Sequence, residues 1–214
     1  PILAAMEETG IKLDQEFFAE FSQELEKRLG EIETRIQKAV GYDFNLNSTQ
    51  QLSQALFEDL ALTPPDRTRK TSSGYYSTAA SVLEGMIGQH DVIDWVLEYR
   101  ELEKLRSTYV DSLPQQINPQ TDRVHTSFNQ TGTVTGRIAS SDPNLQNIPT
   151  RTEIGRRVRN GFIASEGYQL LAVDYSQIEL RIVAHMSQDK AMLDAFNAGQ
   201  DIHATTAAAI NNVN

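Results

Sequence analysis

The chain has 214 residues, no cysteine and a formal net charge of −10 at pH 7, with 39% hydrophobic and 22% charged residues. Such a chain forms one large or two small soluble globular domains, and without cysteine it has no disulfide and no cysteine-based metal or nucleophile chemistry. No apolar run approaches the ~20 residues needed to cross a membrane, and residues 1–10 lack the basic start and the apolar run of a signal peptide. We therefore expect a cytoplasmic protein.

The charge is unevenly distributed along the chain. A negative net charge argues, on average, against a nucleic-acid binder. Between residues 122 and 160, however, six arginines stand against three acids, which gives a local net charge of +3. The overall charge therefore does not exclude a local surface that binds anions.

The first 113 residues are predicted to be almost wholly helical. The clearest helix covers residues 15–40, where apolar side chains recur at a period close to 3.6 residues. Asp14 is suited to cap its N-terminus and Gly41 to end it. Further helices are expected near residues 49–61, 79–87 and 91–113, with a breaker-rich, basic loop at 63–78.

After Pro114 the sequence changes character. Residues 124–140 are rich in Thr, Val and Ser and predict strands, whereas residues 142–149 predict an ordered but irregular segment between two prolines. A helical module followed by an α+β module is the expected architecture. The later elements are a buried strand at 169–174, a helix that carries Ile178, Ile182 and Met186, and a last helix from about His203.

Asp174 stands where the predicted strand ends and the next helix begins. A carboxylate in this place is held rigidly at the edge of a sheet, where the active sites of α/β proteins gather. Mg²⁺ commonly binds one or two carboxylates plus substrate phosphates. Asp is also among the best N-caps of helices. The position by itself favours the cap over the metal ligand.

Two sets of polar residues suit nucleic acid but also have simpler explanations. Arg137, in the turn-like sequence TGR, carries a guanidinium that suits phosphate, carboxylate or a base edge, or forms a structural ion pair. Asn144, Gln146 and Asn147 place three amides in four residues. These amides either hydrogen-bond to bases and sugars or satisfy the backbone of an irregular loop.

The remaining candidates are basic residues near helices. His203 follows Asp201 close to a helix start, where phosphate binds well, although a lone histidine is more often structural. Arg100, Lys104 and Arg106 alternate with acids, as on a solvated helix face or as contacts to phosphates. The sequence contains no HExxH, GxxxxGK[ST] or GxGxxG motif and no Ser-His-Asp signature, which excludes several common enzyme classes.

In their order along the chain, these segments resemble the family A DNA polymerases, the family of bacterial DNA polymerase I. DYSQIELR at 174–181 is similar to motif A of that family, and TGRIASSDPNLQNIP at 135–149 is similar to the segment before it. The likeness covers essentially the whole chain. It also includes GYYSTAASVLE at 74–84, EYRELEKLRSTYVDSLP at 98–114 and DIHATTAA at 201–208.

The resemblance implies template-directed DNA synthesis, in which two Mg²⁺ ions serve nucleotidyl transfer from a dNTP to the 3′-hydroxyl of a primer. Asp174 matches the first of two metal-binding aspartates, and Tyr175 would offer its backbone carbonyl to a metal. Glu179 matches the residue beneath the nucleotide sugar that disfavours a 2′-hydroxyl, so the implied product is DNA. Ser176, Gln177 and Ile178 would line the nucleotide site, His203 would contact the phosphates, and Arg181 would support motif A.

The resemblance also implies contacts with primer–template DNA. Arg137 and Gln146 match readers of the minor groove at the primer terminus, where the acceptors are nearly independent of sequence. The other implied contacts are Asn144 and Asn147 on the duplex backbone, and Arg100 and Lys104 as thumb residues that follow phosphates.

The implied fold is α+β: a mostly helical thumb followed by the first part of an antiparallel-sheet palm and the start of the fingers. The expected division is an entry segment of the palm at 1–16, the thumb at 17–117, the palm with motif A at 118–179 and the start of the fingers at 180–214. The location implied by the family is cytoplasmic and nucleoid-associated, and the activity would serve DNA replication and repair.

The sequence departs from the family pattern in three ways. It lacks the fingers helix with its Arg, Lys and Tyr, and it lacks the later His-Asp-Glu motif with the second metal-binding aspartate. The ending AAAINNVN at 207–214 also differs from the usual pattern. We therefore expect a C-terminal polymerase segment as partner and no activity of the chain alone. The alternative is a non-catalytic primer–template-binding module or one partner-dependent half of a split polymerase.

Overall fold

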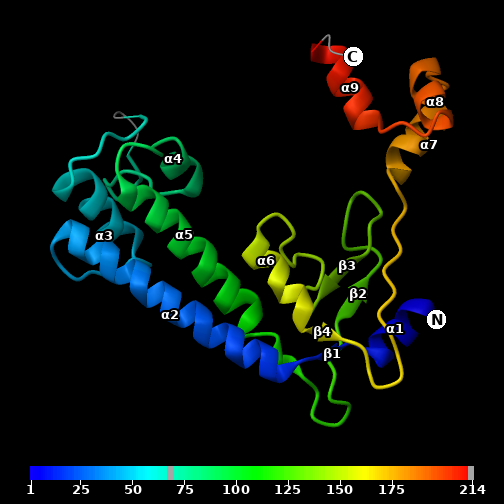
Figure 1. Cartoon of the computed structure of the whole chain (residues 1–214), viewed down its shortest axis with the longest axis horizontal. Coiled ribbons are helices and arrows are strands. Elements are labelled where there is room, and N and C mark those ends of the chain that lie inside the picture. Colours follow the sequence, from blue (N-terminus) through cyan, green and yellow to red (C-terminus); the bar gives the residue numbers. More distant parts are fainter. Residues whose placement is uncertain (67–69, 212–214) are drawn as a thin grey trace. The chain divides into compact units, whose positions relative to one another are not determined.

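The computed structural model describes residues 1–66 and 70–211, and the chain divides into two compact units, Pro1–Gln169 and Leu170–Asn214 (Figure 1). The first unit holds helices α1 to α6 and strands β1 to β4, and the second holds helices α7 to α9. Residues 67–69, within the loop expected at 63–78, lie outside the described residues. The thumb, palm and fingers boundaries expected from the family stay predictions.

The helix predicted at 15–40 is α2 (Gln15–Val40), and both of its ends are capped as expected. Asp14 Oδ1 accepts a hydrogen bond of 3.0 Å from the backbone N–H of Phe17. This bond satisfies one of the N–H groups that the geometry of a helix leaves without a partner. At the other end Gly41 takes a φ of 97°, a left-handed conformation that glycine adopts without a Cβ clash.

The other helices predicted for the first unit are present, and two of them end in a wider turn. Helix α3 (Thr49–Gln54) continues as a π-helical turn, η1 (Ala55–Asp59), within the helix expected at 49–61. Helix α5 (Asp91–Leu105) continues as a second such turn, η2 (Arg106–Val110). The short helix expected around 79–87 is α4 (Ala80–Glu84), and a 3-10 turn, η3 (Pro114–Gln116), follows α5.

The core of the first unit forms where the apolar face of α2 packs against α5, and the two helices lie side by side in Figure 1. Phe18, Phe21 and Leu25 of α2 are almost completely buried, as are Val92 and Leu102 of α5. Burying one large apolar side chain contributes roughly 1.5–3 kcal/mol relative to leaving it in water. The apolar period of the sequence therefore marks the surface that holds this unit together.

The strands form two small antiparallel pairs, so the α+β class is confirmed. Strand β1 (Lys12–Leu13) pairs with β4 (Phe162–Ile163), with Leu13 opposite Phe162. Strand β2 (Ser127–Asn129) pairs with β3 (Ala139–Ser141), with Phe128 opposite Ser140, and both lie at the ends of the region predicted to contain strands. The remaining elements of the first unit are α1 (Ile2–Thr9), α6 (Glu153–Arg157) and the 3-10 turn η4 (Val158–Gly161).

The buried strand predicted at 169–174 is absent from the described structure. Residues 169–175 have no regular secondary structure, and Leu171 and Val173 are 88% and 84% exposed. A strand is stable only when a neighbouring strand pairs with its backbone, and the described residues supply no such neighbour to this segment. The N-cap favoured for Asp174 is also wrong, because helix α7 begins at Ile178 with Gln177 in the cap position.

The second unit consists of three helices joined by short turns. Helix α7 (Ile178–Ser187) is the helix predicted after Asp174, and α9 (Ile202–Asn211) is the predicted last helix. Between them, α8 (Lys190–Asn197) is capped by Asp189, whose Oδ1 accepts from the backbone N–H of Met192 at 2.9 Å. None of the described helices combines the length and the apolar character required to cross a membrane.

A pair of glycine substitutions tests how α2 packs against η4. A Cβ on Gly161 would overlap the ring of Phe18 and lie 2.9 Å from Phe17 Cδ1, so Gly161→Ala should lower the free energy of unfolding by about 1–3 kcal/mol. A Cβ on Gly30, inside α2, would meet no atom within 4 Å. Gly30→Ala should therefore raise the free energy of unfolding by roughly 0.5–1 kcal/mol. Urea denaturation followed by circular dichroism measures both, and equal effects of the two would contradict this packing.

Candidate nucleic-acid interface

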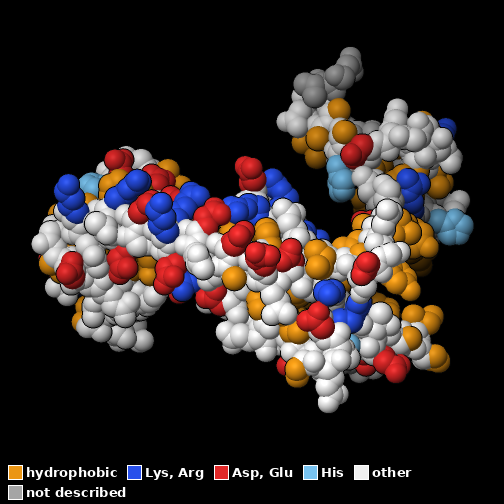
Figure 2. Space-filling view, turned by 60° about the horizontal axis from the view of Figure 1, so that its bottom comes forward, with side chains coloured by type: hydrophobic (Ala, Val, Ile, Leu, Met, Phe, Trp, Pro, Cys, Tyr) orange, Lys and Arg blue, Asp and Glu red, His pale blue; other side chains and the backbone are white. Residues whose placement is uncertain are grey.

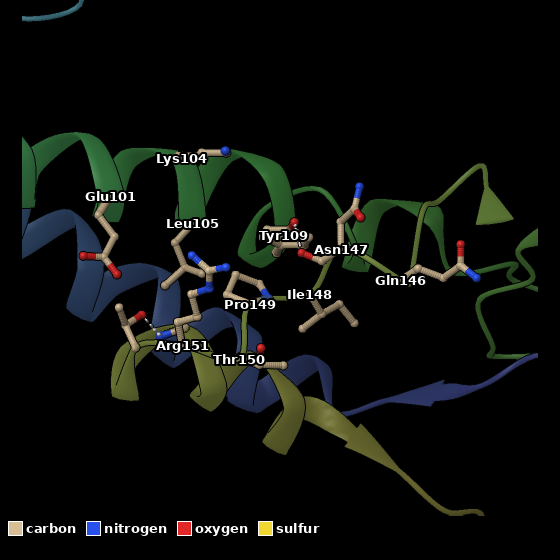
Figure 3. A pocket seen from close by; sticks show the side chains of 12 residues that line it. Glu101, Lys104, Leu105, Tyr109, Gln146, Asn147, Ile148, Pro149, Thr150 and Arg151 are labelled. Atoms are coloured by element: carbon tan, nitrogen blue, oxygen red, sulfur yellow. Dashed lines mark hydrogen bonds between the residues drawn. The ribbon is translucent and has the colours of Figure 1, made fainter. Parts of the chain in front are cut away.

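A groove of about 570 Å³ runs between α5 and the loop that leads to α6 (Figure 3). Glu101 and Lys104 of α5 lie on one side with Tyr109 of η2, and residues 146–152 lie on the other. Lys104 and Arg151 are exposed cations on this groove. A groove that combines amides with cations suits a phosphate backbone.

The backbone of the irregular segment at 142–149 is anchored to the core beside this groove. Tyr109, which is 7% exposed, donates its hydroxyl hydrogen to the backbone carbonyl of Asn147, and Figure 3 shows this bond. The next residue, Ile148, is buried in the core. The segment predicted to be irregular but ordered therefore has that character, and the exposed side chains of Gln146 and Asn147 project from a fixed backbone.

The amide of Gln146 is bound on two sides by the backbone of its own loop and of β3. Its Oε1 accepts from the Ser140 N–H at 3.1 Å, and its Nε2 donates to the Ile138 carbonyl at 2.8 Å. Asn144 Oδ1 in turn accepts from the Gln146 N–H at 2.9 Å. Of the two uses weighed for these amides, the structure shows the bonds to the backbone.

Arg137 lies in the exposed turn that precedes β3. Gly136, with a φ of 79°, takes a left-handed conformation there, and the hydroxyl of Thr133 donates to the Arg137 carbonyl at 2.7 Å. The turn expected from TGR is therefore present, and the side chain of Arg137 is exposed.

The two cations expected to follow phosphates differ in their surroundings. Lys104 is exposed on the groove. Arg100 is half-buried, and its guanidinium donates to the carbonyl and, at 3.1 Å, to the hydroxyl of Thr78. Burial lowers the pKa of the Arg100 guanidinium from its usual value, because removal from water disfavours the charged form. From the sequence both residues have the same expected role, whereas the structure shows that their surroundings differ.

Two arginines of α6 form structural bonds. Arg156 Nη1 donates to the carbonyls of Thr150 and Arg151 at 3.2 and 3.0 Å. Arg157 binds both carboxylate oxygens of Glu24 at 2.7 Å and lies over the ring of Phe21. The sequence did not indicate the role of Arg157, since its partners Glu24 and Phe21 come from a distant segment. Basic and acidic side chains are interspersed over the part of the molecule that holds α2 and α5 (Figure 2).

In the second unit, Asp174 lies in an exposed segment that leads into α7. Asp174, Tyr175 and Ser176 are exposed, and Gln177 takes a φ of 55°, a left-handed conformation uncommon for residues other than glycine. Arg181 Nε donates to the Ser176 carbonyl at 2.9 Å, and its guanidinium lies over the ring of Phe196. Arg181 therefore links this turn to α8. Ile178 and Glu179, the first two residues of α7, are also exposed.

His203 lies at the start of α9, as expected. Asp201 Oδ1 accepts from the backbone N–H groups of His203 and Ala204 at 2.8 and 3.3 Å, and from Gln177 Nε2 at 3.3 Å. The hydrogen bond from the His203 N–H, together with these other donors, lowers the pKa of the Asp201 carboxyl. Asp201 thus brings Gln177 and the start of α9 together, a role that the sequence indicated only by its place before a helix.

The residues around Asp174 fit a magnesium site in part. A carboxylate and a backbone carbonyl are the hard oxygen ligands that Mg²⁺ prefers, and substrate phosphates supply others. Among residues 1–66 and 70–211, however, no three side chains of Asp, Glu or His lie together as a metal site. The roles expected of Asp174 and the Tyr175 carbonyl as magnesium ligands stay predictions.

Comparisons with known proteins identify the family of this chain. The profile of DNA polymerase family A matches residues 15–214. The thermostable DNA polymerase I of Thermus filiformis is 52% identical over 207 residues, which are 97% of this chain and 25% of that protein. DNA polymerase I of a Synechocystis species is 49% identical over 206 residues, which are 96% of this chain and 21% of that protein.

A solved structure shows the same fold. It is the POL domain of Pol1 from M. smegmatis in complex with DNA primer-template and dNTP, with a TM-score of 0.85 and 38% identity over 99% of this chain and 37% of that chain. The chain belongs to DNA polymerase family A, as its resemblance indicated. It spans about a quarter of the length of the relatives that it matches.

The ion pair between Glu24 and Arg157 predicts a pH-dependent link between α2 and α6. Bonding to Arg157 lowers the pKa of Glu24 below 4.5, so the pair stabilises the fold above that pH and is lost as the pH falls through the folded-state pKa. A double-mutant cycle with Glu24→Gln and Arg157→Gln should give a coupling of about 0.2–1 kcal/mol at pH 7, since the pair is largely exposed. At a pH below the folded-state pKa the coupling should vanish. A coupling energy between Glu24 and Arg157 that persists in acid would show that it does not come from the charged carboxylate.

Proposed function

We propose that this chain is part of a template-directed DNA polymerase, which transfers a nucleotide from a dNTP to the 3′-hydroxyl of a primer. The observation that carries this proposal is the family match over residues 15–214, which includes DYSQIELR and the segment at 142–149. The similar domain from M. smegmatis is in complex with DNA primer-template and dNTP, which supports the same two ligands for this chain.

The second unit would supply the nucleotide end of the site. The carboxylate of Asp174 and the carbonyl of Tyr175 would hold Mg²⁺. Bound Mg²⁺ would make the primer hydroxyl a better nucleophile and neutralise charge on the leaving pyrophosphate. Glu179 would pack beneath the sugar and exclude a 2′-hydroxyl, because that hydroxyl would meet its side chain.

Other residues of this unit would shape the nucleotide pocket. Arg181, bonded to the Ser176 carbonyl, would hold the turn after Asp174 in place. His203, at the start of α9, would meet the nucleotide phosphates where a helix N-terminus favours negative charge. The pocket itself would be lined by Ser176, Gln177 and Ile178.

The first unit would hold the primer–template duplex. Lys104 would contact phosphates from its exposed place on the groove. Arg137 and Gln146 would donate hydrogen bonds to the minor groove, whose purine N3 and pyrimidine O2 acceptors occur in every base pair. Asn144 and Asn147 would hold the duplex backbone. Arg100 would act beside Lys104 on phosphates through the donors that Thr78 leaves unused.

A two-metal site needs more carboxylates than the described residues bring together. We propose that a C-terminal polymerase segment supplies the second aspartate and the fingers helix. The relatives are about four times as long as the region that this chain matches, which leaves room for such a segment in a complete polymerase.

The proposed role of Asp174 as a metal ligand, together with the need for a C-terminal segment, predicts which forms of the chain extend a primer. The 214-residue chain alone should not extend a primer. A fusion of residues 1–214 to the part of the Thermus filiformis polymerase that follows its matched region should do so. In that fusion Asp174→Asn should lower the extension rate on the order of 10³-fold, since metal-assisted charge stabilisation contributes several kcal/mol. Single-turnover extension of a labelled primer measures this.

The control for this experiment is Glu166→Gln, which removes an exposed carboxylate from the first unit. Its extension rate should stay within about twofold of the unmodified fusion, because surface substitutions usually have small effects. An Asp174→Asn fusion with nearly unchanged rate would refute the ligand role, and extension by the chain alone would refute the need for a partner segment.

A second candidate function is primer–template binding without chemistry. It is favoured by the groove beside α5, where the exposed Lys104 and Arg151 lie near the amides of Gln146 and Asn147 and no metal ligand is needed. In this case the chain would bind a duplex through Lys104 and Arg137 and would contribute no catalytic group. The fusion separates the two functions, because the binding module predicts no extension in either form.

Both functions predict salt-sensitive duplex binding through Lys104. Loss of one phosphate contact should weaken binding and reduce the slope of log Kd against log salt by about 1. Fluorescence anisotropy of a labelled primer–template with Lys104→Ala over a range of salt concentrations measures this slope. Lys27→Ala, which removes an exposed lysine of α2 outside the groove, is the matched control and should leave the slope unchanged. A slope that Lys104→Ala does not change would exclude the contact.

A further inference from the structure

Two buried hydroxyl groups lie beneath the segment that carries the duplex-reading amides. They belong to Thr126, just before β2, and to Ser140 of β3, which are 7% and 4% exposed. Their oxygen atoms are 2.7 Å apart. Because both residues are buried, neither hydroxyl is placed to touch a large ligand.

The neighbours of the two hydroxyls set the direction of the hydrogen bonds between them. The Leu145 N–H, which is only a donor, lies 3.1 Å from Ser140 Oγ. The Pro143 carbonyl, which is only an acceptor, lies 2.7 Å from Thr126 Oγ1. Each hydroxyl has a single hydrogen. The shortest contacts are used when Ser140 donates to Thr126 and Thr126 donates to Pro143. The Ser141 carbonyl, 3.0 Å from Thr126 Oγ1, is a second acceptor for the Thr126 hydroxyl, and the Pro143 carbonyl also lies 3.3 Å from Ser140 Oγ.

This chain of hydrogen bonds begins and ends in the same segment. It starts at the N–H of Leu145 and returns to the carbonyl of Pro143, so it closes around Asn144. Bonds that point in one direction polarise one another and strengthen the chain. The two hydroxyls therefore hold the backbone on both sides of Asn144 at a fixed distance from β3.

The same strand fixes the orientation of Gln146. The Ser140 N–H must face an acceptor, so the atom 3.1 Å away is the amide oxygen, and the nitrogen faces the Ile138 carbonyl. The amide nitrogen has two hydrogens, and Ile138 takes one of them. The second hydrogen, on an exposed side chain, suits an acceptor of the minor groove.

We propose that Thr126 and Ser140 are positioning residues for primer–template recognition. They act through the backbone at 143–146, which holds the donor of Gln146 in place before DNA arrives. This inference rests on the proposed function, because it assumes that Gln146 reads the duplex. A donor that is already ordered loses less conformational freedom on binding, and the two hydroxyls provide this order without contacting DNA.

The test compares two substitutions of Thr126 in the 214-residue chain. Thr126→Val keeps the shape of the side chain and removes the hydroxyl, so it should raise the Kd for a labelled primer–template about 3–10-fold, the range expected for one net hydrogen bond. Thr126→Ser keeps the hydroxyl and should stay within about twofold of the unmodified chain. Fluorescence anisotropy at fixed salt, well below the unfolding temperature, measures both.

A double-mutant cycle separates positioning from general destabilisation. Gln146→Ala should itself raise the Kd about 3–10-fold. If Thr126 acts through Gln146, Thr126→Val should add less than about twofold in the Gln146→Ala background, because residues that act through one group are not additive. Fully multiplicative effects would overturn the positioning role.

The remaining outcomes distinguish the inference from the proposed function. An effect of Gln146→Ala without an effect of Thr126→Val refutes the positioning role and leaves the reading role of Gln146 intact. If neither substitution changes the Kd, or if the chain binds no duplex at all, both roles are refuted.

A second variant and an exchange measurement keep the test decisive if Thr126→Val does not fold. Ser140→Ala removes the acceptor of the Leu145 N–H and should give the same pattern of Kd values. Amide hydrogen exchange at Leu145 should become faster in Ser140→Ala, whereas amides in the buried part of α2 keep their protection. Unchanged exchange at Leu145 would contradict the bond on which the inference depends.

Discussion

Burial of the apolar face of α2 against α5 is the interaction on which the first unit depends. The aromatic end of α2 also fixes later parts of the chain, since Phe18 packs against Gly161 and the ring of Phe21 lies beneath Arg157. On the other helix, Tyr109 continues the buried stripe of α5 and donates to the Asn147 carbonyl. Both walls of the groove are therefore attached to one core, and its shape follows from helix packing.

Hydrogen bonding fixes the irregular segment at 142–149, which carries the amides proposed to read DNA. Such a segment has no ladder or helix to satisfy its backbone, so side chains must do so. Asn144, Gln146, Ser140 and Thr126 carry out this task, and none of the buried side-chain polar atoms in the described residues lacks a partner. The amides weighed as either structural or DNA-reading can serve both purposes, because a Gln amide has more donors than its own loop uses.

The second unit shows how far a local pattern determines structure. Leu170, Leu171 and Val173 have the composition of a buried strand, yet they are exposed and unpaired in the described structure. A strand depends on a neighbour that no local sequence supplies. Helices α7, α8 and α9 form as expected or with ordinary caps, because their hydrogen bonds are internal. The same physical difference explains why α7 and α9 were predicted correctly and this strand was not.

The sequence by itself determined helices α2, α3, α4, α5, α7 and α9, the caps of α2, the α+β class and membership of DNA polymerase family A, because these depend on local periodicity and on short ordered motifs. Only the tertiary structure decided which polar residues act together. Arg157 meets Glu24, Arg100 meets Thr78, and Thr126 meets Ser140 across separations that no spacing rule connects. A hydrogen bond or ion pair depends on distances of about 3 Å, and such distances between remote residues are set by the packing of whole elements.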